Sequence, residues 1–342
     1  MALLHALLQS EQITLKRFIN SCIMLDLTIA TWDYDRIRPV LDGRVKLSGC
    51  NLNYIILPPE ECFYRAYILK EFEISEIGFI PYIVAKSQGL SAYSAIPVFL
   101  SRMFRHSCIY VRKDRGIEVP ADLIGKKVGV VEYQMSAATW CRGFLKDIYG
   151  VDPSDINWFQ GGVNKPGRFE KFPLQLDANF PLQKIAESAT LSYLLENGDL
   201  DAVISPEIPF CYHKKCKNIG RLFDNFAEIE REYFQATGIF PIMHALGIRN
   251  DIHSQNPWLV STLYNAFNEA KNIAEQDLIE TRALKIGLPW LFDHSLETKK
   301  IMGDDPWPYG IDANKKTLQK SLDYVKGQGL ARHNLEIKDL FV

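Results

Sequence analysis

The sequence lacks the features that mark membrane proteins and nucleic-acid-binding proteins. No apolar run approaches the roughly 20 residues needed to cross a bilayer, and the closest, around Ile77 to Ala85, is far too short. Neither sign of charge dominates, since 39 Lys and Arg face 41 Asp and Glu and the net charge is -2. No global field therefore attracts nucleic acid or anionic lipid. We expect neither a nucleic acid nor a membrane as partner.

Paired cysteines and a secretion signal are missing as well. The seven cysteines are odd in number and form no CxxC pair, which argues against a disulfide framework and against a structural zinc site. Glu11, Lys16 and Arg17 interrupt the apolar start, and no clean cleavage site follows. The histidines show no metal-type spacing, so we expect no metal. These absences favour a cytoplasmic protein, and the extension 1–24 is assigned no role.

The composition is that of an ordinary globular protein. Hydrophobic residues make up 47% of the 342-residue chain, aromatic residues 12% and charged residues 23%. A chain of this length exceeds the usual size of one core. We therefore expect one large domain or two medium ones, of roughly 100 to 200 residues each.

Strand and helix patterns alternate along the chain and predict an α/β fold. The segment Leu25 to Arg36 alternates apolar and polar residues and then turns polar, as a strand that leads into a loop does. A strand over 127–131 and an amphipathic helix over 135–149 begin a second βα unit, and helices are expected over 258–284 and 315–325. Such alternation implies doubly wound sheets that bind ligands at the carboxyl ends of their strands.

Seven motifs together resemble one family. The phrase ADLIGKKVGVVEYQ is similar to the start of the second lobe in periplasmic-binding-protein-like folds of type II. Read with six further motifs, which span nearly everything after residue 25, the chain resembles the 4,5-dihydroxyphthalate decarboxylase family. Those motifs are WDYDR (Trp32 to Arg36), IPVFLSRMFRHSCIYV (Ile96 to Val111), EYQMSAATWCRG (Glu132 to Gly143), GGVNKPGR (Gly161 to Arg168), FPIMHALGIRND (Phe240 to Asp251) and DPWPYGI (Asp305 to Ile311).

The resemblance implies a two-lobed α/β fold with a cleft between the lobes. Each lobe is then a doubly wound mixed sheet, and two crossing strands join them. Lobe 1 is expected to be discontinuous, over 25–112 and 243–342, with the C-terminal helices returning to it, and lobe 2 over 113–242.

The resemblance also implies an activity, the non-oxidative decarboxylation of a hydroxylated aromatic carboxylic acid. The substrate is then similar to 4,5-dihydroxyphthalate and the product to protocatechuate. No cofactor is expected, because the phenol supplies the electrons, and a homo-oligomer is left open. Two alternatives remain, a small-molecule solute-binding protein that takes a carboxylate and another cytoplasmic lyase on the same fold.

Three basic residues of the second motif form the first candidate site. Arg102, Arg105 and His106 are predicted in a loop between strands, where two guanidinium groups and an imidazole converge on one anion. His106 is then a catalytic proton donor or an orienting group. The alternative is a solvated loop whose histidine has a structural partner.

Polar residues after the first strand of the second lobe form another candidate site. Glu132, Tyr133 and Gln134 stand at the carboxyl end of that strand, and Thr139 is expected nearby. Partial desolvation would let Glu132 act as a general acid, which makes it the second catalytic candidate. The alternative is a charged strand end that pairs with a lysine.

Further substrate-binding candidates come from other segments. Four follow the first strand: Trp32, Asp33, Tyr34 and Arg36. Trp32 is also a candidate for the core. His244 lies in a strand-like segment near the second crossing, where a structural role is the alternative. Glu207 stands where family members usually carry an arginine, and its charge would repel a second carboxylate, so the exact substrate stays open.

Overall fold

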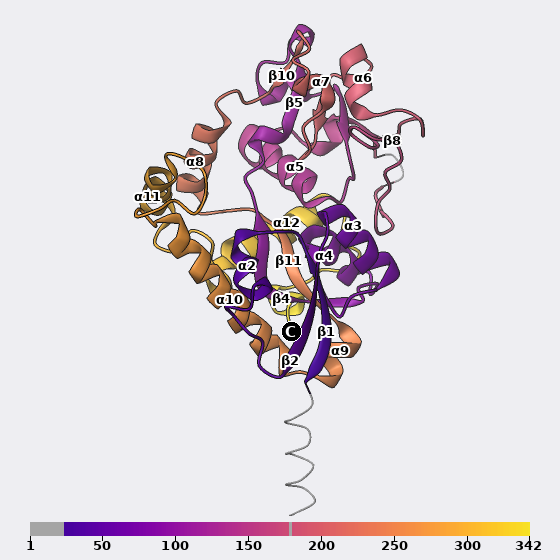
Figure 1. Ribbon diagram of the computed structural model, residues 1–342. Coiled ribbons are helices and arrows are strands. Elements are labelled where there is room, and N and C mark those ends of the chain that lie inside the picture. The colour runs from indigo at the N-terminus through magenta and orange to yellow at the C-terminus, as the bar shows by residue number, and fades with distance from the viewer. Residues whose placement is uncertain (1–23, 178–179) are drawn as a thin grey trace, which may run out of the picture.

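A computed structural model describes residues 24–177 and 180–342. Within them, two sheets form two lobes, one above the other in Figure 1. Almost all of the predicted extension 1–24 lies outside the described residues. No helix of the described ranges is long and apolar enough to cross a membrane.

The first lobe is built on a five-stranded mixed sheet in the order β2-β1-β3-β11-β4. Its strand β1 pairs in parallel with β2 and β3, whereas β11 runs antiparallel between β3 and β4. The strands are β1 (Leu25–Thr31), β2 (Cys50–Ile56), β3 (Ile74–Gly78), β4 (Tyr93–Arg102) and β11 (Ile242–Arg249). Its α-helices are α2 (Arg38–Leu41), α3 (Pro59–Tyr64), α4 (Phe79–Ser87), α9 (Asn250–Gln255), α10 (Leu259–Leu278), α11 (Leu291–Met302), α12 (Lys315–Gly327) and α13 (Ile337–Leu340).

The second lobe is built on a six-stranded mixed sheet in the order β10-β5-β9-β6-β7-β8. Its strands are β5 (Ile109–Arg112), β6 (Lys127–Val130), β7 (Asn157–Gln160), β8 (Leu182–Lys184), β9 (Ala202–Ile204) and β10 (Ile219–Arg221). Its α-helices are α5 (Ser136–Tyr149), α6 (Leu191–Asn197), α7 (Phe210–His213) and α8 (Phe226–Thr237). Strand β5, which the predicted boundary after residue 112 assigns to lobe 1, pairs with β9 and β10 of the second sheet.

Local sequence explains where the elements of the site begin and end. Helix α5 is buried over residues 136–145 and ends at Tyr149, where Gly150 follows with a φ of 70°, a conformation that glycine adopts without strain. Helix α10 ends at Leu278 and not at 284 as the sequence pattern predicted. Strand β3 is wholly buried although it carries Glu76, so this acid must find partners inside the protein.

The C-terminal helix α12 contacts both lobes, through α4 of the first and α5 of the second, and lies between them in Figure 1. The contact with α5 depends on Gly143, where an added Cβ atom would lie 2.1 Å from the ring of Tyr324. That ring also meets the edge of Trp140, with centroids 5.2 Å apart. The helix thus helps to fix the two sides of the cleft relative to each other.

Candidate active site

A cavity of about 560 Å³ lies between the lobes, within the usual range for small-molecule sites. The first lobe supplies the loop after β1, the start of α3 and the ends of β3 and β4. The second lobe supplies the segment after β6, the start of α5 and the loops after β7 and β9. Six predicted site residues line this cleft: Trp32, Tyr34, Arg105, Glu132, Glu207 and His244.

A buried carboxylate and a histidine form the centre of the first-lobe wall. Strands β3 and β11 are antiparallel neighbours, which brings Glu76 and His244 together across 168 residues of sequence. The His244 Nδ1 atom lies 2.6 Å from Glu76 Oε1, and the Tyr34 hydroxyl donates to the same oxygen at 2.6 Å. The other oxygen of Glu76 accepts from the backbone N–H of Trp32 at 2.8 Å.

These contacts keep Glu76 ionised. Burial alone would raise the pKa of its carboxyl, but the contact with His244 and the hydrogen bonds from Tyr34 and Trp32 outweigh burial and hold it below the ordinary value. An ionised carboxylate only accepts hydrogen bonds, so Nδ1 of His244 carries the proton of this contact. The ring edge-packs on Phe63 with centroids 4.7 Å apart. The Nε2 atom is thereby left for a ligand in the cleft.

Arg105 brings a buried positive charge to the same cavity. The residue is 8% exposed, and its guanidinium contacts sulfur atoms: Met243 Sδ at 3.1 Å, Met103 Sδ at 3.4 Å and Cys108 Sγ at 3.7 Å. No acidic side chain of the described residues forms an ion pair with it. Burying a charge without an opposite partner is unfavourable, so an anion in the cleft would complete this site.

Glu132 on the opposite wall is held by two cations. Its carboxylate is 2.7 Å from Arg168 Nε and 2.7 Å from Lys171 Nζ, and the residue is 1% exposed. Arg168 also pairs with Glu60 at the start of α3, so it links the two lobes across the cleft. Glu132 is thus a strand end paired with a lysine and an arginine, which is the arrangement that the alternative interpretation describes.

Glu207 and the start of α5 complete the cavity wall. Glu207 Oε1 accepts from Asn164 Nδ2 at 2.8 Å, which leaves its second oxygen for another donor. Ser136, at the start of α5, donates through Oγ to the Met243 carbonyl at 2.9 Å and accepts from the Ile80 N–H at 3.2 Å. The first-turn N–H groups of a helix have no partner within it and favour negative charge.

The structure does not bring His106 into the cleft. Its ring stacks on Phe144 with centroids 4.1 Å apart and meets the edges of Phe223 and Tyr233 at 5.4 Å. Neither ring nitrogen has a hydrogen-bond partner among the described residues, and Glu230 Oε1 lies 3.8 Å from Nδ1. His106 is therefore not among the residues that line the cleft, and its predicted role as proton donor stays a prediction.

Arg102 also faces away from the cavity. Its guanidinium donates to the carbonyls of Pro308 and Phe240 and to Asn314 Oδ1, at 3.2, 3.1 and 2.6 Å. Both terminal nitrogens, Nη1 and Nη2, are thereby bonded to oxygen atoms of the protein itself, whereas Nε has no hydrogen-bond partner among the described residues. Arg102 does not line the cleft, and its side chain links the end of β4 to Pro308 and Asn314 of the C-terminal segment.

Two predicted residues of the loop after β1 point elsewhere. Asp33 pairs with Arg38 at the surface, 2.9 Å apart. Arg36 lies between the rings of Tyr34 and Trp307, 4.1 and 4.2 Å from their centroids, and donates to the Leu100 carbonyl. Neither residue lines the cleft in this structure.

Three predicted residues around α5 are buried in the second lobe. Tyr133 lies under the Arg142 guanidinium, 3.6 Å from its ring centroid. Gln134 Nε2 donates to the Phe172 carbonyl at 2.7 Å, and Thr139 Oγ1 accepts from Arg142 at 3.2 Å. None of the three lines the cleft, since the start of α5 presents Met135 to Ala137 there.

Sequence analysis missed Glu76, Arg168 and Lys171. An acid inside an otherwise apolar strand pattern was a usable sign for Glu76. Arg168 ends the GGVNKPGR motif, but that motif was interpreted as a turn. No sequence pattern marks Lys171. No group of three or more His, Cys, Asp or Glu side chains in the described ranges could hold a metal ion.

Comparisons with known proteins agree on one family. The chain is 40% identical over 317 residues to the 4,5-dihydroxyphthalate decarboxylase of Comamonas testosteroni, which covers 93% of this chain and 96% of the relative. It is 41% identical over 212 residues to the enzyme of the same name from Pseudomonas putida, covering 62% and 82%. No model of a protein family matches the chain.

Among solved structures, the periplasmic aliphatic sulphonate binding protein SsuA of Escherichia coli matches with a TM-score of 0.52. The match covers 93% of this chain and 97% of SsuA at 14% identity, so it shows the fold alone. The predicted two-lobed fold and the predicted family are both confirmed. The chain belongs to the 4,5-dihydroxyphthalate decarboxylase family.

Proposed function

We propose that the protein is a carboxy-lyase that removes one carboxylate, as carbon dioxide, from a hydroxylated aromatic dicarboxylate. The observation that carries this proposal is the placement of Arg105, a buried cation without an acidic partner, in one cleft with the Glu76–His244 pair. The names of both relatives make 4,5-dihydroxyphthalate the first substrate to test.

The cleft offers two cationic positions for two carboxylates. Arg105 presents a fork of N–H donors that suits bidentate binding of one carboxylate. Lys171 and Arg168 line the second-lobe wall, where they already bind Glu132. In the proposed complex the other carboxylate binds on that side by displacing the exposed Glu60 from Arg168. Trp32 and Phe63 supply the apolar surface against which the ring packs.

His244 is the proposed proton donor. Its imidazolium form, held by Glu76, donates the Nε2 proton to the ring carbon that bears the departing carboxylate. The ring hydroxyl para to that carbon supplies electron density, so protonation yields a stabilised cation. The carbon–carbon bond then breaks, its electron pair returns to the ring, and carbon dioxide leaves. Glu76 is a positioning residue in this scheme, because its contact with Nδ1 fixes the orientation of the His244 ring.

Glu207 has a place in the proposed complex as a hydrogen-bond acceptor. Sequence analysis treated its negative charge as a cause of repulsion with a second carboxylate. One of its oxygens is bound by Asn164, and the other is available for a phenolic O–H, which a carboxylate accepts well. A substrate with ring hydroxyls thus suits Glu207 better than unsubstituted phthalate does.

The test is product analysis with matched ligands. Purified protein is incubated with 4,5-dihydroxyphthalate, phthalate and 3,4-dihydroxybenzoate, and carbon dioxide and the aromatic product are measured. We expect one equivalent of carbon dioxide and 3,4-dihydroxybenzoate from the first compound, and none from phthalate, which lacks the activating hydroxyls. Release of water without carbon dioxide would favour a different lyase, and tight binding without conversion would favour a solute-binding protein.

A further inference from the structure

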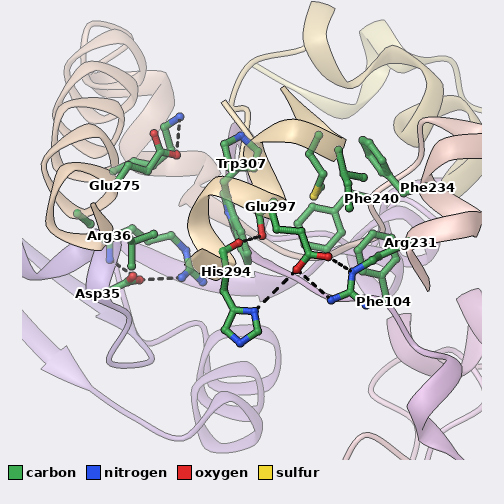
Figure 2. A pocket seen from close by; sticks show the side chains of 17 residues that line it. Asp35, Arg36, Phe104, Arg231, Phe234, Phe240, Glu275, His294, Glu297 and Trp307 are labelled. Carbon is green, nitrogen blue, oxygen red and sulfur yellow. Dashed lines mark hydrogen bonds and ion pairs between the residues drawn. The ribbon is translucent and has the colours of Figure 1, made fainter. Parts of the chain in front are cut away.

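A second cavity, of about 410 Å³, lies outside the cleft and shares no lining residue with it. Its walls come from α8, α10 and α11, from the loop after β4 and from the segment that precedes β11. Figure 2 shows its lining side chains, with Glu275 and Arg36 on one side and Arg231 and Phe234 on the other. The reaction proposed for the cleft uses none of these residues.

The cavity is lined by aromatic rings. Phe104 and Phe240 are stacked with centroids 4.7 Å apart, and Phe240 meets Trp307 edge-on at 5.3 Å. Phe234 edge-packs on Phe104 at 6.4 Å. Aromatic walls of this kind favour a flat apolar ligand that adds a further ring to the array.

The cationic groups of the wall already have anionic partners. Arg231 Nε is 3.4 Å from Glu297 Oε1, and Arg36 Nη1 is 3.0 Å from Asp35. Lys271 Nζ is 2.7 Å from Asp305 Oδ1. An anionic ligand would have to displace one of these carboxylates. The charge arrangement therefore favours a neutral occupant, in contrast to the cleft with Arg105.

One polar atom of the wall lacks a hydrogen bond. Glu275 Oε1 is buried and has no hydrogen-bond partner in the described part of the chain. Lys271 Nζ forms an ion pair with this oxygen at 3.4 Å, longer than its 2.7 Å hydrogen bond to Asp305 Oδ1. Burial also raises the pKa of Glu275, as expected where a carboxylate is poorly solvated. A ligand that donates a hydrogen bond would satisfy this oxygen.

We propose that this cavity binds a small neutral aromatic molecule that carries a hydroxyl group. The ring lies among Phe104, Phe240 and Trp307, and the hydroxyl donates to Glu275. The site is separate from the proposed reaction and goes beyond it. Phe104 stands in the chain between Met103 and Arg105, which both line the cleft. The two cavities therefore contact the same segment, the connection between β4 and β5.

Binding of three matched probes tests the proposal. Isothermal titration calorimetry is run with 2-naphthol, with 2-methoxynaphthalene, which lacks the donor, and with 2-naphthoate, which carries an anion on the same ring. We expect 2-naphthol to bind, the methyl ether to bind about fivefold to tenfold more weakly because one hydrogen bond is lost, and the naphthoate not to bind in this cavity.

Variants locate the binding. Ala274→Trp and Met302→Trp each place an indole in the cavity, and either should abolish 2-naphthol binding. Arg105→Met changes only the cleft and should leave 2-naphthol binding as in the wild type. Circular dichroism checks that each variant folds.

A crystal of the wild-type protein soaked with 6-bromo-2-naphthol gives an answer that depends on no variant. Bromine density among Phe104, Phe240 and Trp307 would support the proposal. Density only in the cleft, no density at all, or unchanged 2-naphthol binding in both folded tryptophan variants would overturn it.

Discussion

Two histidines of this chain lie in opposite surroundings. His106 is packed among the rings of Phe144 and Tyr233 in the second lobe, and neither of its ring nitrogens has a hydrogen-bond partner among the described residues. His244 lines the cleft, and an ionised carboxylate holds one nitrogen at 2.6 Å. Of these two imidazoles, only His244 has a carboxylate partner and lines the cleft, and proton transfer to a ligand needs both. A histidine's chemistry is thus set by its neighbours and not by its nearness to a motif.

Two arginines repeat this contrast three residues apart in sequence. The terminal nitrogens of Arg102 donate hydrogen bonds to oxygen atoms of the protein, whereas the guanidinium of Arg105 contacts sulfur atoms and lines the cleft. Arg102 therefore has a structural role, and Arg105 is the proposed binding site for an anionic ligand. Exchanges at these paired positions separate the two roles.

The largest contrast is expected at the histidines. His244→Gln should lower kcat by about 100-fold to 10,000-fold, the usual contribution of a general acid. His106→Gln should keep kcat within about threefold of the wild type but lower the free energy of unfolding by about 1–3 kcal/mol, because it disrupts buried ring packing. Steady-state kinetics and urea denaturation measure both. Loss of turnover in folded His106→Gln with normal turnover in His244→Gln would reverse the assignment.

The arginines should give the next contrast. Arg105→Met should lower kcat/KM by about 100-fold or more, since two charge-assisted hydrogen bonds to a carboxylate are lost. Arg102→Met should lower stability by about 1–3 kcal/mol through its unpaired carbonyl partners, with little change in the kcat/KM of the folded protein. Equal effects of both exchanges on kcat/KM would contradict the account.

The third prediction concerns Glu76, which is proposed to position the His244 ring. Glu76→Gln should lower kcat by about tenfold or more, a part of the general-acid contribution, and leave KM nearly unchanged. The folded-state pKa of Glu76 lies below 4.5, so its ionised form stabilises the fold above pH 4.5, and this contribution is lost as the pH falls through the lower folded value. Urea denaturation of the wild type and of Glu76→Gln is compared above pH 4.5 and at a pH well below it. This contribution to the free energy of unfolding should be lost at the lower pH only in the wild type.

Ionisation of Glu170 changes the free energy of unfolding in the opposite sense to ionisation of Glu76. Burial and the nearby charge of Glu132 raise its pKa from 4.5 to about 7. Ionisation therefore destabilises the fold as the pH rises from 4.5 through 7. Glu170→Gln should gain up to about 3 kcal/mol over the wild type at pH 8 and nothing near pH 4.5, because one pKa unit corresponds to about 1.4 kcal/mol. Thermal melting at both pH values checks this, and a gain that is equal at both would contradict the raised pKa.

Patterns local in sequence predicted much of the fold. The order of strands and helices, the helix α5 and the resemblance that implies two lobes could all be obtained from short segments. The partner of β5 could not, because the same apolar residues suit either sheet. Its pairing with β9 depends on contacts about 90 residues away in the chain, at Ile109 and Ile204.

The site was less predictable for the same reason. Glu76 meets His244 only because β3 and β11 are neighbours in the sheet. The RMFRH segment contributes Met103 and Arg105 to the cleft lining, but its sequence does not reveal which side chain faces the cleft. The short helix His106–Cys108 turns His106 into the aromatic cluster, and Arg105, one residue earlier, reaches the cavity.

The most direct test of the central claim is a crystal structure of the His244→Gln variant with 4,5-dihydroxyphthalate bound. The account predicts one substrate carboxylate on the Arg105 guanidinium and the ring carbon that bears a carboxylate beside position 244. A substrate bound on Arg102 or against His106, with position 244 remote from the ring, would contradict it.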